Sequence, residues 1–233
     1  MLEARALAAA YGRAQVLFGL DLTLSRGEVV ALLGRNGAGK STTLKALMGL
    51  VPSTAGEVRF RGVRIERLAP WQIARLGLAY VPEDRRIFTG LTVAENLEAG
   101  RLPRREGAGH WTPARLYELF PNLGRMRDRP GGSMSGGEQQ MLSLARGLMG
   151  NPLALLLDEP SEGLAPVIVD GLAQAILELK REGLCVLLAE QNLRFARRIA
   201  DRACILETGQ LRHDGAMAAL EADPALRERF LAA

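Results

Sequence analysis

Cysteine and histidine, the residues that build most structural metal sites and disulfide frameworks, are scarce in this chain. Its 233 residues include two cysteines, Cys185 and Cys204, and two histidines. Both cysteines lie in apolar runs, so we interpret them as small buried side chains in a reducing, cytosolic setting. Two cysteines and two distant histidines cannot supply the ligand spacing of a zinc site. The sequence therefore excludes zinc-binding domains and disulfide-stapled folds.

Long apolar runs and lysines are scarce as well. No run approaches the ~20 apolar residues that a membrane-spanning helix needs, and the short apolar start, with Glu3 inside it, predicts no targeting signal. Only three of the 30 basic residues are lysines, and the net charge is +4. An arginine-rich basic chain raises the possibility of nucleic-acid binding, which depends on where the charges lie.

The composition that remains is that of a globular protein, with 48% hydrophobic and 24% charged residues. Continuous apolar runs predict buried strands, and apolar residues at helical spacing predict amphipathic helices between them. This alternation is typical of an α/β fold with a mostly parallel sheet. The expected strands are 29–33, 76–82, 153–157 and 184–189, and the expected helices begin at 39, 141 and 168.

Three further segments complete the expected organisation. Residues 15–33 read as a hairpin, because alternating leucines are followed by turn residues at 25–28 and then by an apolar strand. A second hairpin is expected over 203–211, turning at Thr208-Gly209, and Asp223-Pro224 predicts the start of a last helix. Residues 85–133, with many glycines and arginines and short amphipathic pieces, predict a mostly helical insertion.

Polar residues follow each buried strand at the end where ligands bind in open α/β sheets. The strands lead to Gly34, to Glu83, to Asp158-Glu159 and to Glu190-Gln191. Because the carboxyl ends of parallel strands share one edge of the sheet, we expect phosphate, metal or water chemistry at that edge.

Residues 34–41 match the phosphate-loop pattern G-x-x-x-x-G-K-[ST], and they lie between a predicted strand and a predicted helix, as the pattern requires. Glycines allow the backbone to fold around a phosphate and aim its N–H groups at it. Lys40 supplies a full positive charge, and the Ser41 hydroxyl suits Mg²⁺. The alternative is a glycine-rich turn without a ligand.

Two adjacent carboxylates, Asp158 and Glu159, end the strand at 153–157. One carboxylate there can hold Mg²⁺ directly or through water, and the other could polarise an attacking water molecule. The alternative is a simple helix cap.

Residues 135–140, Ser-Gly-Gly-Glu-Gln-Gln, place a hydroxyl and two glycines at the start of an amphipathic helix. Alone, this pattern indicates either a second anion site or an ordinary capped helix. The stretch resembles the signature motif of ABC-transporter ATPases. In the order of that family, residues 34–41 match Walker A and residues 153–159 match Walker B, and the resemblance covers nearly the whole chain.

The resemblance implies a role for each matching residue. Glu159 would be catalytic together with Gln191, which stands at the switch-histidine position. Mg²⁺ would be held by Ser41, by Asp158 and by Glu83, of which Glu83 stands at the Q-loop position. Tyr11 would stack on adenine, and residues 161–164, Ser161-Glu162-Gly163-Leu164, would form the D-loop. The residues implied to bind ATP are Tyr11, Gly34, Arg35, Asn36, Gly37, Ala38, Gly39, Lys40, Ser41 and Thr42. Those implied to contact the ATP of a partner subunit are Ser135, Gly136, Gly137 and Glu138.

The family also implies an architecture. The fold would be a P-loop, RecA-like core within a single ABC ATPase domain, 1–233. Residues 1–30 and 54–75 would form an antiparallel β subdomain, 85–143 a helical subdomain with the signature motif, and 29–53 and 144–233 the core. Two such subunits would close head to tail around two ATP molecules, and the helical subdomain would dock on membrane partners.

Two positions depart from the common family pattern, which has Gln and His where this chain has Glu83 and Gln191. Gln191 can donate its amide to a phosphate oxygen but cannot carry a proton. Glu83 adds negative charge near the phosphates. With the arginines and Phe88 that follow Glu83, this pattern resembles the smaller second ATPase of branched-chain amino-acid importers.

We therefore expect an ATPase of a membrane importer at the cytoplasmic face of the inner membrane. Its expected partners are permease subunits, a second ABC ATPase subunit and, indirectly, a periplasmic solute-binding protein. The alternatives are an importer for another small solute such as urea, or a soluble ABC ATPase acting on nucleic acid. A GTPase or kinase is a further alternative, since residues 128–131 fit D-x-x-G, but no N-K-x-D follows.

The charge imbalance has a local origin. Residues 85–133 contain nine arginines and five acidic residues, which accounts for the whole net charge of +4. The excess lies in the insertion expected to face membrane partners, so we expect no nucleic-acid binding; a solvated arginine-rich face is the alternative.

Overall fold

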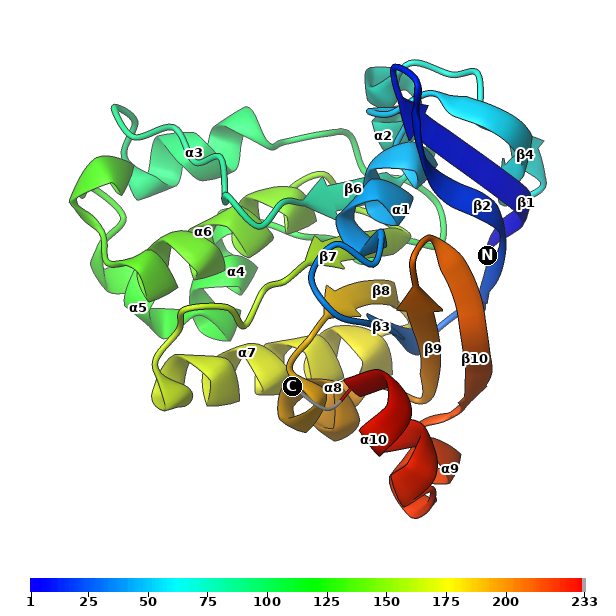
Figure 1. Cartoon of the computed structure of the whole chain (residues 1–233). Helices are drawn as coiled ribbons and strands as arrows, with labels where there is room; N and C mark the ends of the chain where they lie inside the picture. The colour runs from blue at the N-terminus through cyan, green and yellow to red at the C-terminus, as the bar shows by residue number, and fades with distance from the viewer. Residues whose placement is uncertain (232–233) are drawn as a thin grey trace.

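A six-stranded sheet runs through the centre of the molecule (Figure 1). The structure, a computed structural model, describes residues 1–231. Five strands are parallel, and β10 pairs antiparallel with β9 at one edge. The predicted strands and the hairpin at Thr208-Gly209 are confirmed. In spatial order the strands are β10 (Gln210–Ala216), β9 (Arg202–Glu207), β3 (Val29–Leu33), β8 (Cys185–Glu190), β7 (Ala154–Asp158) and β6 (Leu78–Val81).

A second, antiparallel sheet has the order β2-β1-β4-β5. It consists of β1 (Leu2–Tyr11), β2 (Ala14–Leu24), β4 (Ser53–Phe60) and β5 (Val63–Arg64). The hairpin expected over 15–33 is therefore wrong, because β2 pairs with β1 while β3 joins the central sheet. The physical reason is burial: β2 alternates buried and exposed residues, whereas every residue of β3 is buried and needs cover on both faces.

The helix α1 (Lys40–Leu47) lies between the two sheets (Figure 1). Its residues Leu44 and Leu47 pack in one cluster with Leu32 of the central sheet and Phe60 of the antiparallel sheet. The opposite face of the central sheet is covered by α6 (Gly136–Leu148), α7 (Pro166–Arg181) and α8 (Leu193–Ile199). Helix α1 is thus packed against both sheets. This packing also fixes the position of the glycine-rich loop that precedes the helix.

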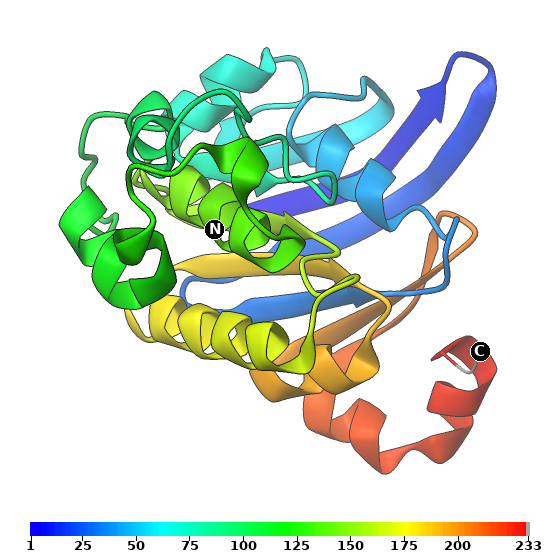
Figure 2. The same cartoon turned by 90° about the vertical axis from the view of Figure 1, so that its left-hand side faces the viewer.

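The helices of the insertion gather on one side of the molecule (Figure 2), but they cover fewer than half of residues 85–133, so the insertion is less helical than expected. It contains α3 (Val93–Ala99), α4 (Pro113–Leu119), α5 (Pro121–Arg125) and a 3₁₀ turn at Gly131–Ser133, while α2 (Pro70–Leu76) precedes β6. The subdomain boundaries given above stay a prediction.

The described chain ends in α9 (Met217–Ala222) and α10 (Pro224–Leu231). The backbone N–H of Leu226 donates to Asp223 Oδ1 at 3.1 Å, so the predicted helix start at Asp223-Pro224 is confirmed. Both cysteines are buried, as expected. Within residues 1–231, no helix combines the length and the apolar character needed to cross a bilayer.

Candidate functional site

The glycine-rich loop joins the carboxyl end of β3 to the start of α1. A Cβ atom on Gly34 would lie 2.4 Å from the carbonyl oxygen of Leu206, so no other residue fits there. Gly39 precedes the helix with φ of 106° and would place a Cβ atom 3.1 Å from Leu17. The loop conformation therefore depends on glycine at these two positions.

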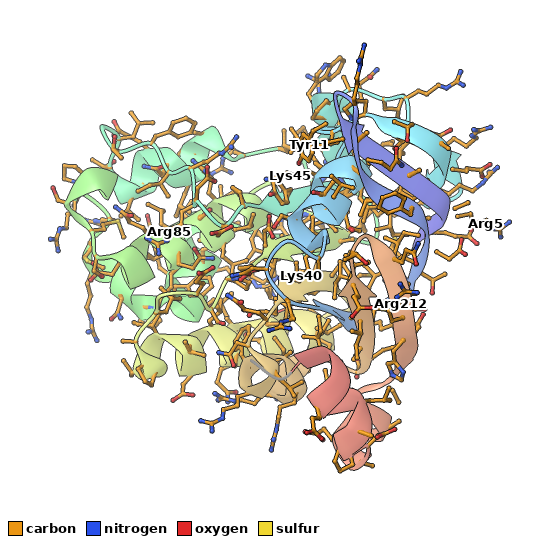
Figure 3. All side chains as sticks on the ribbon, viewed as in Figure 1. Arg5, Tyr11, Lys40, Lys45, Arg85 and Arg212 are labelled. Atoms are coloured by element: carbon orange, nitrogen blue, oxygen red, sulfur yellow. The ribbon has the colours of Figure 1, made fainter. Side chains whose placement is uncertain are left out.

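Lys40 lies at the centre of the structure, with its side chain buried (Figure 3). Its Nζ donates to the carbonyl oxygen of Gly34 at 2.9 Å and forms an ion pair with Glu159 Oε1 at 3.0 Å. The second carboxylate oxygen of Glu159 is buried and has no hydrogen-bond partner. The predicted phosphate-binding lysine and the predicted catalytic carboxylate thus hold each other.

Asp158 is held by two hydroxyl groups. Ser41 Oγ donates to Asp158 Oδ1, and the Tyr80 hydroxyl donates to Asp158 Oδ2, both at 2.8 Å. Burial raises the pKa of Asp158, and it also raises the pKa of Tyr80. These two donors fix the orientation of a carboxylate that opens toward the glycine-rich loop.

The donor set near Ser41 fits Mg²⁺ rather than a metal held by protein alone. The Ser41 and Asp158 oxygens lie side by side, and Mg²⁺ characteristically takes one or two protein oxygens together with waters and phosphates. In the part of the chain that the structure describes, no three histidine, cysteine or acidic side chains gather as an all-protein cage would require.

A cavity of about 400 Å³ opens around the lysine and the loop. It brings together Glu83, from the loop after β6, and Glu159 and Glu162, from the loop after β7, opposite the glycine-rich loop and the start of α1. Burial, followed by the charges of Glu159 and Glu83, raises the pKa of Glu162. The cavity can therefore hold an anion against Lys40 with carboxylates beside it. Its lining residues are Val16, Asn36, Gly37, Gly39, Lys40, Ser41, Thr42, Glu83, Glu159 and Glu162.

Other predicted site residues lie outside this cavity. Tyr11, at the end of β1, is 49% exposed, and Gln191 is exposed just after β8. Ser135 and Glu138 cap α6: the Ser135 N–H donates to Glu138 Oε2 at 2.7 Å, and the Glu138 N–H donates to Ser135 Oγ at 3.4 Å. These contacts lower the pKa of Glu138. The structure therefore separates the signature residues from the cavity of their own chain.

The two signature glycines are packed closely. A Cβ atom on Gly136 would lie 3.0 Å from the guanidinium of Arg85, and one on Gly137 would lie 3.0 Å from Ile168. Figure 3 shows Arg85 on the helical side of the molecule, away from Lys40. The start of α6 therefore has no room for larger side chains without a shift of its neighbours.

Sequence reasoning did not assign roles to two residues of the site, Tyr80 and Val16. Tyr80 stands inside an apolar run, where its hydroxyl gives no pattern to detect. Val16 reaches the cavity from the other sheet, which the expected hairpin did not bring there. Glu162, from the stretch that resembles the D-loop, lines the same cavity.

Comparison with known sequences places the chain among ABC proteins. The family model described as ABC transporter matches residues 17–162. The branched-chain amino acid transport ATP-binding protein BraG of Pseudomonas aeruginosa is 42% identical over 221 residues, which is 95% of each chain. The probable LivF protein of Archaeoglobus fulgidus is 36% identical over 92% of each chain. The lipopolysaccharide export ATP-binding protein LptB of Escherichia coli is 37% identical over 90% of this chain and 88% of that one.

Solved structures of ABC ATPases share the fold of this chain. An ATP-binding subunit of an ABC transporter is 30% identical with a TM-score of 0.82, covering 97% of this chain and 94% of that one. A nucleotide-free ATP-binding cassette is 25% identical with a TM-score of 0.84, covering 98% and 97%. The predicted α/β fold with an antiparallel amino-terminal sheet is confirmed. The alternative of a GTPase or kinase is wrong. The chain therefore belongs to the ABC transporter family, as the ATP-binding, ATP-hydrolysing subunit of a transporter.

Proposed function

We propose that this transporter is an importer of branched-chain amino acids and that the cavity at Lys40 is where its ATP is hydrolysed. The observation that carries the site assignment is the buried contact between Lys40 and Glu159 in one cavity with Ser41. The amino-acid assignment is supported by the 42% identity to BraG and the 36% identity to LivF. LptB, named for lipopolysaccharide export, is similar at 37%, so the direction and the substrate need a direct test.

Nucleotide binding would begin with an exchange of partners at Lys40. In the structure its ammonium group is held by the Gly34 carbonyl oxygen and by Glu159. Phosphates in the loop offer that ammonium group stronger negative charge, and the start of α1 adds its positive dipole end. As Lys40 turns to the phosphates, Glu159, which already lines the cavity, loses its ion pair and becomes available to a water molecule.

Hydrolysis would then rest on Glu159 as the group that orients water. Its carboxylate accepts a hydrogen bond from a water molecule placed in line with the terminal phosphorus and takes the proton as the new oxygen–phosphorus bond forms. The bond from that phosphorus to the bridging oxygen breaks at the same time, so that ADP leaves with the bridging oxygen. Ser41 and Asp158 would hold Mg²⁺, which when bound neutralises charge on the phosphates. Glu83 lines the same cavity and could hold it through water. Gln191 can donate its amide to a phosphate oxygen, while Tyr11 would stack on adenine.

A second subunit would complete each site. Ser135, Gly136 and Gly137 start a helix of 13 residues, and none of them lines the cavity of its own chain. Such a helix start presents unpaired N–H groups and a positive dipole end to an anion. We place it against the terminal phosphate bound by a second ABC ATPase subunit, and the reverse contact completes the other site.

The permease subunits have a candidate docking surface in a groove of about 520 Å³ between α2, β6 and α6. Its walls are largely apolar, with Leu50, Phe88 and Leu102 among the lining residues, and arginines such as Arg86 lie at the same groove. A short permease segment with apolar and acidic side chains fits this lining. Docking there would hold the chain at the cytoplasmic face of the inner membrane.

Transport assays test the assignment. The chain, purified from membranes together with its permeases and reconstituted into vesicles, is expected to drive uptake of labelled leucine, isoleucine and valine when ATP is supplied on its side. The Glu159→Gln complex serves as the inactive control. ATP-driven uptake of urea instead would contradict the branched-chain amino-acid assignment. Lipid export, or purification with nucleic acid and no permease, would contradict the importer assignment itself.

A further inference from the structure

Glu190 is a buried carboxylate that the hydrolysis scheme leaves without a role. It is the last residue of β8, and only 1% of it is exposed. A buried carboxylate is costly unless hydrogen bonds compensate it. Burial raises the pKa of Glu190, and none of the described side chains forms an ion pair with it. Retaining an acid at the end of a strand that is otherwise apolar calls for a specific contact.

That contact is a pair of backbone N–H groups from two different loops. Glu190 Oε1 accepts from the N–H of Ser161 at 3.1 Å, and Oε2 accepts from the N–H of Asn192 at 3.0 Å. The Asn192 side chain donates to Ser161 Oγ at 3.4 Å, which closes a ring of hydrogen bonds. Asn192 also caps α8, since its Oδ1 accepts from the N–H of Phe195. The ring therefore joins the loop after β7 to the loop after β8.

These two loops carry the groups expected to face the terminal phosphate. Ser161 stands two residues after Glu159, and Asn192 directly follows Gln191. Glu159 itself has φ of 44°, a left-handed conformation that a residue with a side chain adopts only when its surroundings hold it. Its N–H donates to the Ala189 carbonyl oxygen at 2.9 Å, one residue before Glu190. The chain around Glu159 is thus fastened to β8 on both sides.

We propose that Glu190 is a positioning residue for ATP hydrolysis, which ties the loop of Glu159 to the loop of Gln191 through Ser161 and Asn192. This inference rests on the proposed function of Glu159. A carboxylate suits the task because it offers two acceptor oxygens to two N–H donors. Glutamine would offer one acceptor and turn an NH₂ group toward the other N–H, so the ring would open at one side.

The test compares Glu190→Gln with Glu28→Gln in the full-length chain. Glu28 is a matched control, because its carboxylate also accepts from a backbone N–H, that of Ser25 at 2.7 Å, but lies before β3 at the opposite end of the sheet. Misplacing a catalytic group by about 1 Å can lower a rate by roughly a hundredfold. Glu190→Gln is therefore expected to lower kcat about ten- to a hundredfold, with KM and ATP affinity within about twofold. Glu28→Gln is expected to keep its kcat.

A second variant keeps the test decisive if Glu190→Gln folds poorly. Asn192→Asp retains the helix-capping oxygen but replaces the donor to Ser161 Oγ, so a smaller loss of kcat at unchanged ATP affinity is expected. Wild-type kcat in the folded variants, or a parallel loss of kcat and ATP affinity, overturns the inference. Glu159→Gln is measured alongside: if it still hydrolyses ATP, the proposed function itself fails, whereas an inactive Glu159→Gln with an active Glu190→Gln removes only the role of Glu190.

Discussion

At the residue scale, the central contact is the buried ion pair between Lys40 and Glu159, whose atoms lie 3.0 Å apart. Removing one partner of such a pair typically costs about 3–5 kcal/mol, because the other charge stays buried without compensation. Here Glu159 already has one oxygen without a hydrogen-bond partner. The pair therefore stabilises the folded chain and holds Lys40 and Glu159 together at the cavity.

Lys40→Ala is expected to abolish ATP binding and to lower the free energy of unfolding of the nucleotide-free chain by about 3 kcal/mol. The double variant Lys40→Ala, Glu159→Gln is expected to recover part of that loss, since a neutral amide tolerates burial better than an unpaired carboxylate. Urea unfolding of the wild type, both single variants and the double variant measures the coupling. Additive effects of the two substitutions would show that the pair does not stabilise the protein.

The sequence predicts the phosphate loop and the acidic pair because their spacing and their places at strand ends are local. The Lys40–Glu159 contact is not predictable in that way, because the fold brings together two residues that lie far apart in the sequence. Tyr80 is missed, and Glu190 is expected at the functional edge of the sheet but without a role, for a related reason. Their roles come from hydrogen bonds across neighbouring strands and loops, and nothing in the residues beside them along the chain indicates those bonds.

At the scale of elements, the strands of the central sheet are predictable because each is an apolar run between clear turn residues. The expected hairpin over 15–33 is wrong, since a turn between two strands does not say whether they pair or join different sheets. The arginine-rich insertion also needs the structure for its interpretation. Arg105 donates to backbone carbonyl oxygens. Most other arginines of the insertion are exposed, as on a solvated face: Arg86, Arg101, Arg104, Arg125, Arg127 and Arg129.

Arg105 joins the ends of two helices. Its guanidinium donates to the Asn151 carbonyl oxygen at 2.7 Å, just beyond α6, and to the Arg75 carbonyl oxygen at 3.1 Å, in the last turn of α2. Arg105→Ala is expected to lower the free energy of unfolding by about 1–3 kcal/mol, because hydrogen bonds from a charged donor to helix carboxyl ends are lost. Arg104→Ala is the neighbouring control. Equal thermal midpoints for the two variants would contradict this role.

At the scale of the whole molecule, the proposed hydrolysis of ATP requires two chains. The signature residues at the start of α6 lie outside the cavity of their own chain, and we propose that they contact the nucleotide of a partner subunit. Without a second subunit, hydrolysis would lack the donors proposed for the terminal phosphate. Whether that second subunit is a copy of this chain or a related ATPase decides only which two surfaces meet.

Ser135→Arg is expected to block ATP-dependent dimerisation without weakening ATP binding by the monomer, because the guanidinium fills the space proposed for the partner's phosphate. Thr92→Arg is a matched control. Thr92 caps α3 through the same kind of reciprocal contact with Glu95 that Ser135 makes with Glu138. Thr92→Arg therefore removes a comparable helix cap at a different helix. Size-exclusion chromatography with ATP in the Glu159→Gln background, with the partner ATPase added if the chain alone stays monomeric, measures the result. A dimer formed by Ser135→Arg would contradict the trans contact.

The most direct test of the account is the rate of ATP hydrolysis by Glu159→Gln, measured together with its ATP affinity. Loss of a general base typically lowers a rate about 10²- to 10⁴-fold, and the substitution leaves Lys40 and Ser41 in place to bind phosphate and metal. We predict that Glu159→Gln lowers the rate of ATP hydrolysis at least about a hundredfold and keeps its ATP affinity. Hydrolysis near the wild-type rate at full ATP occupancy would contradict it.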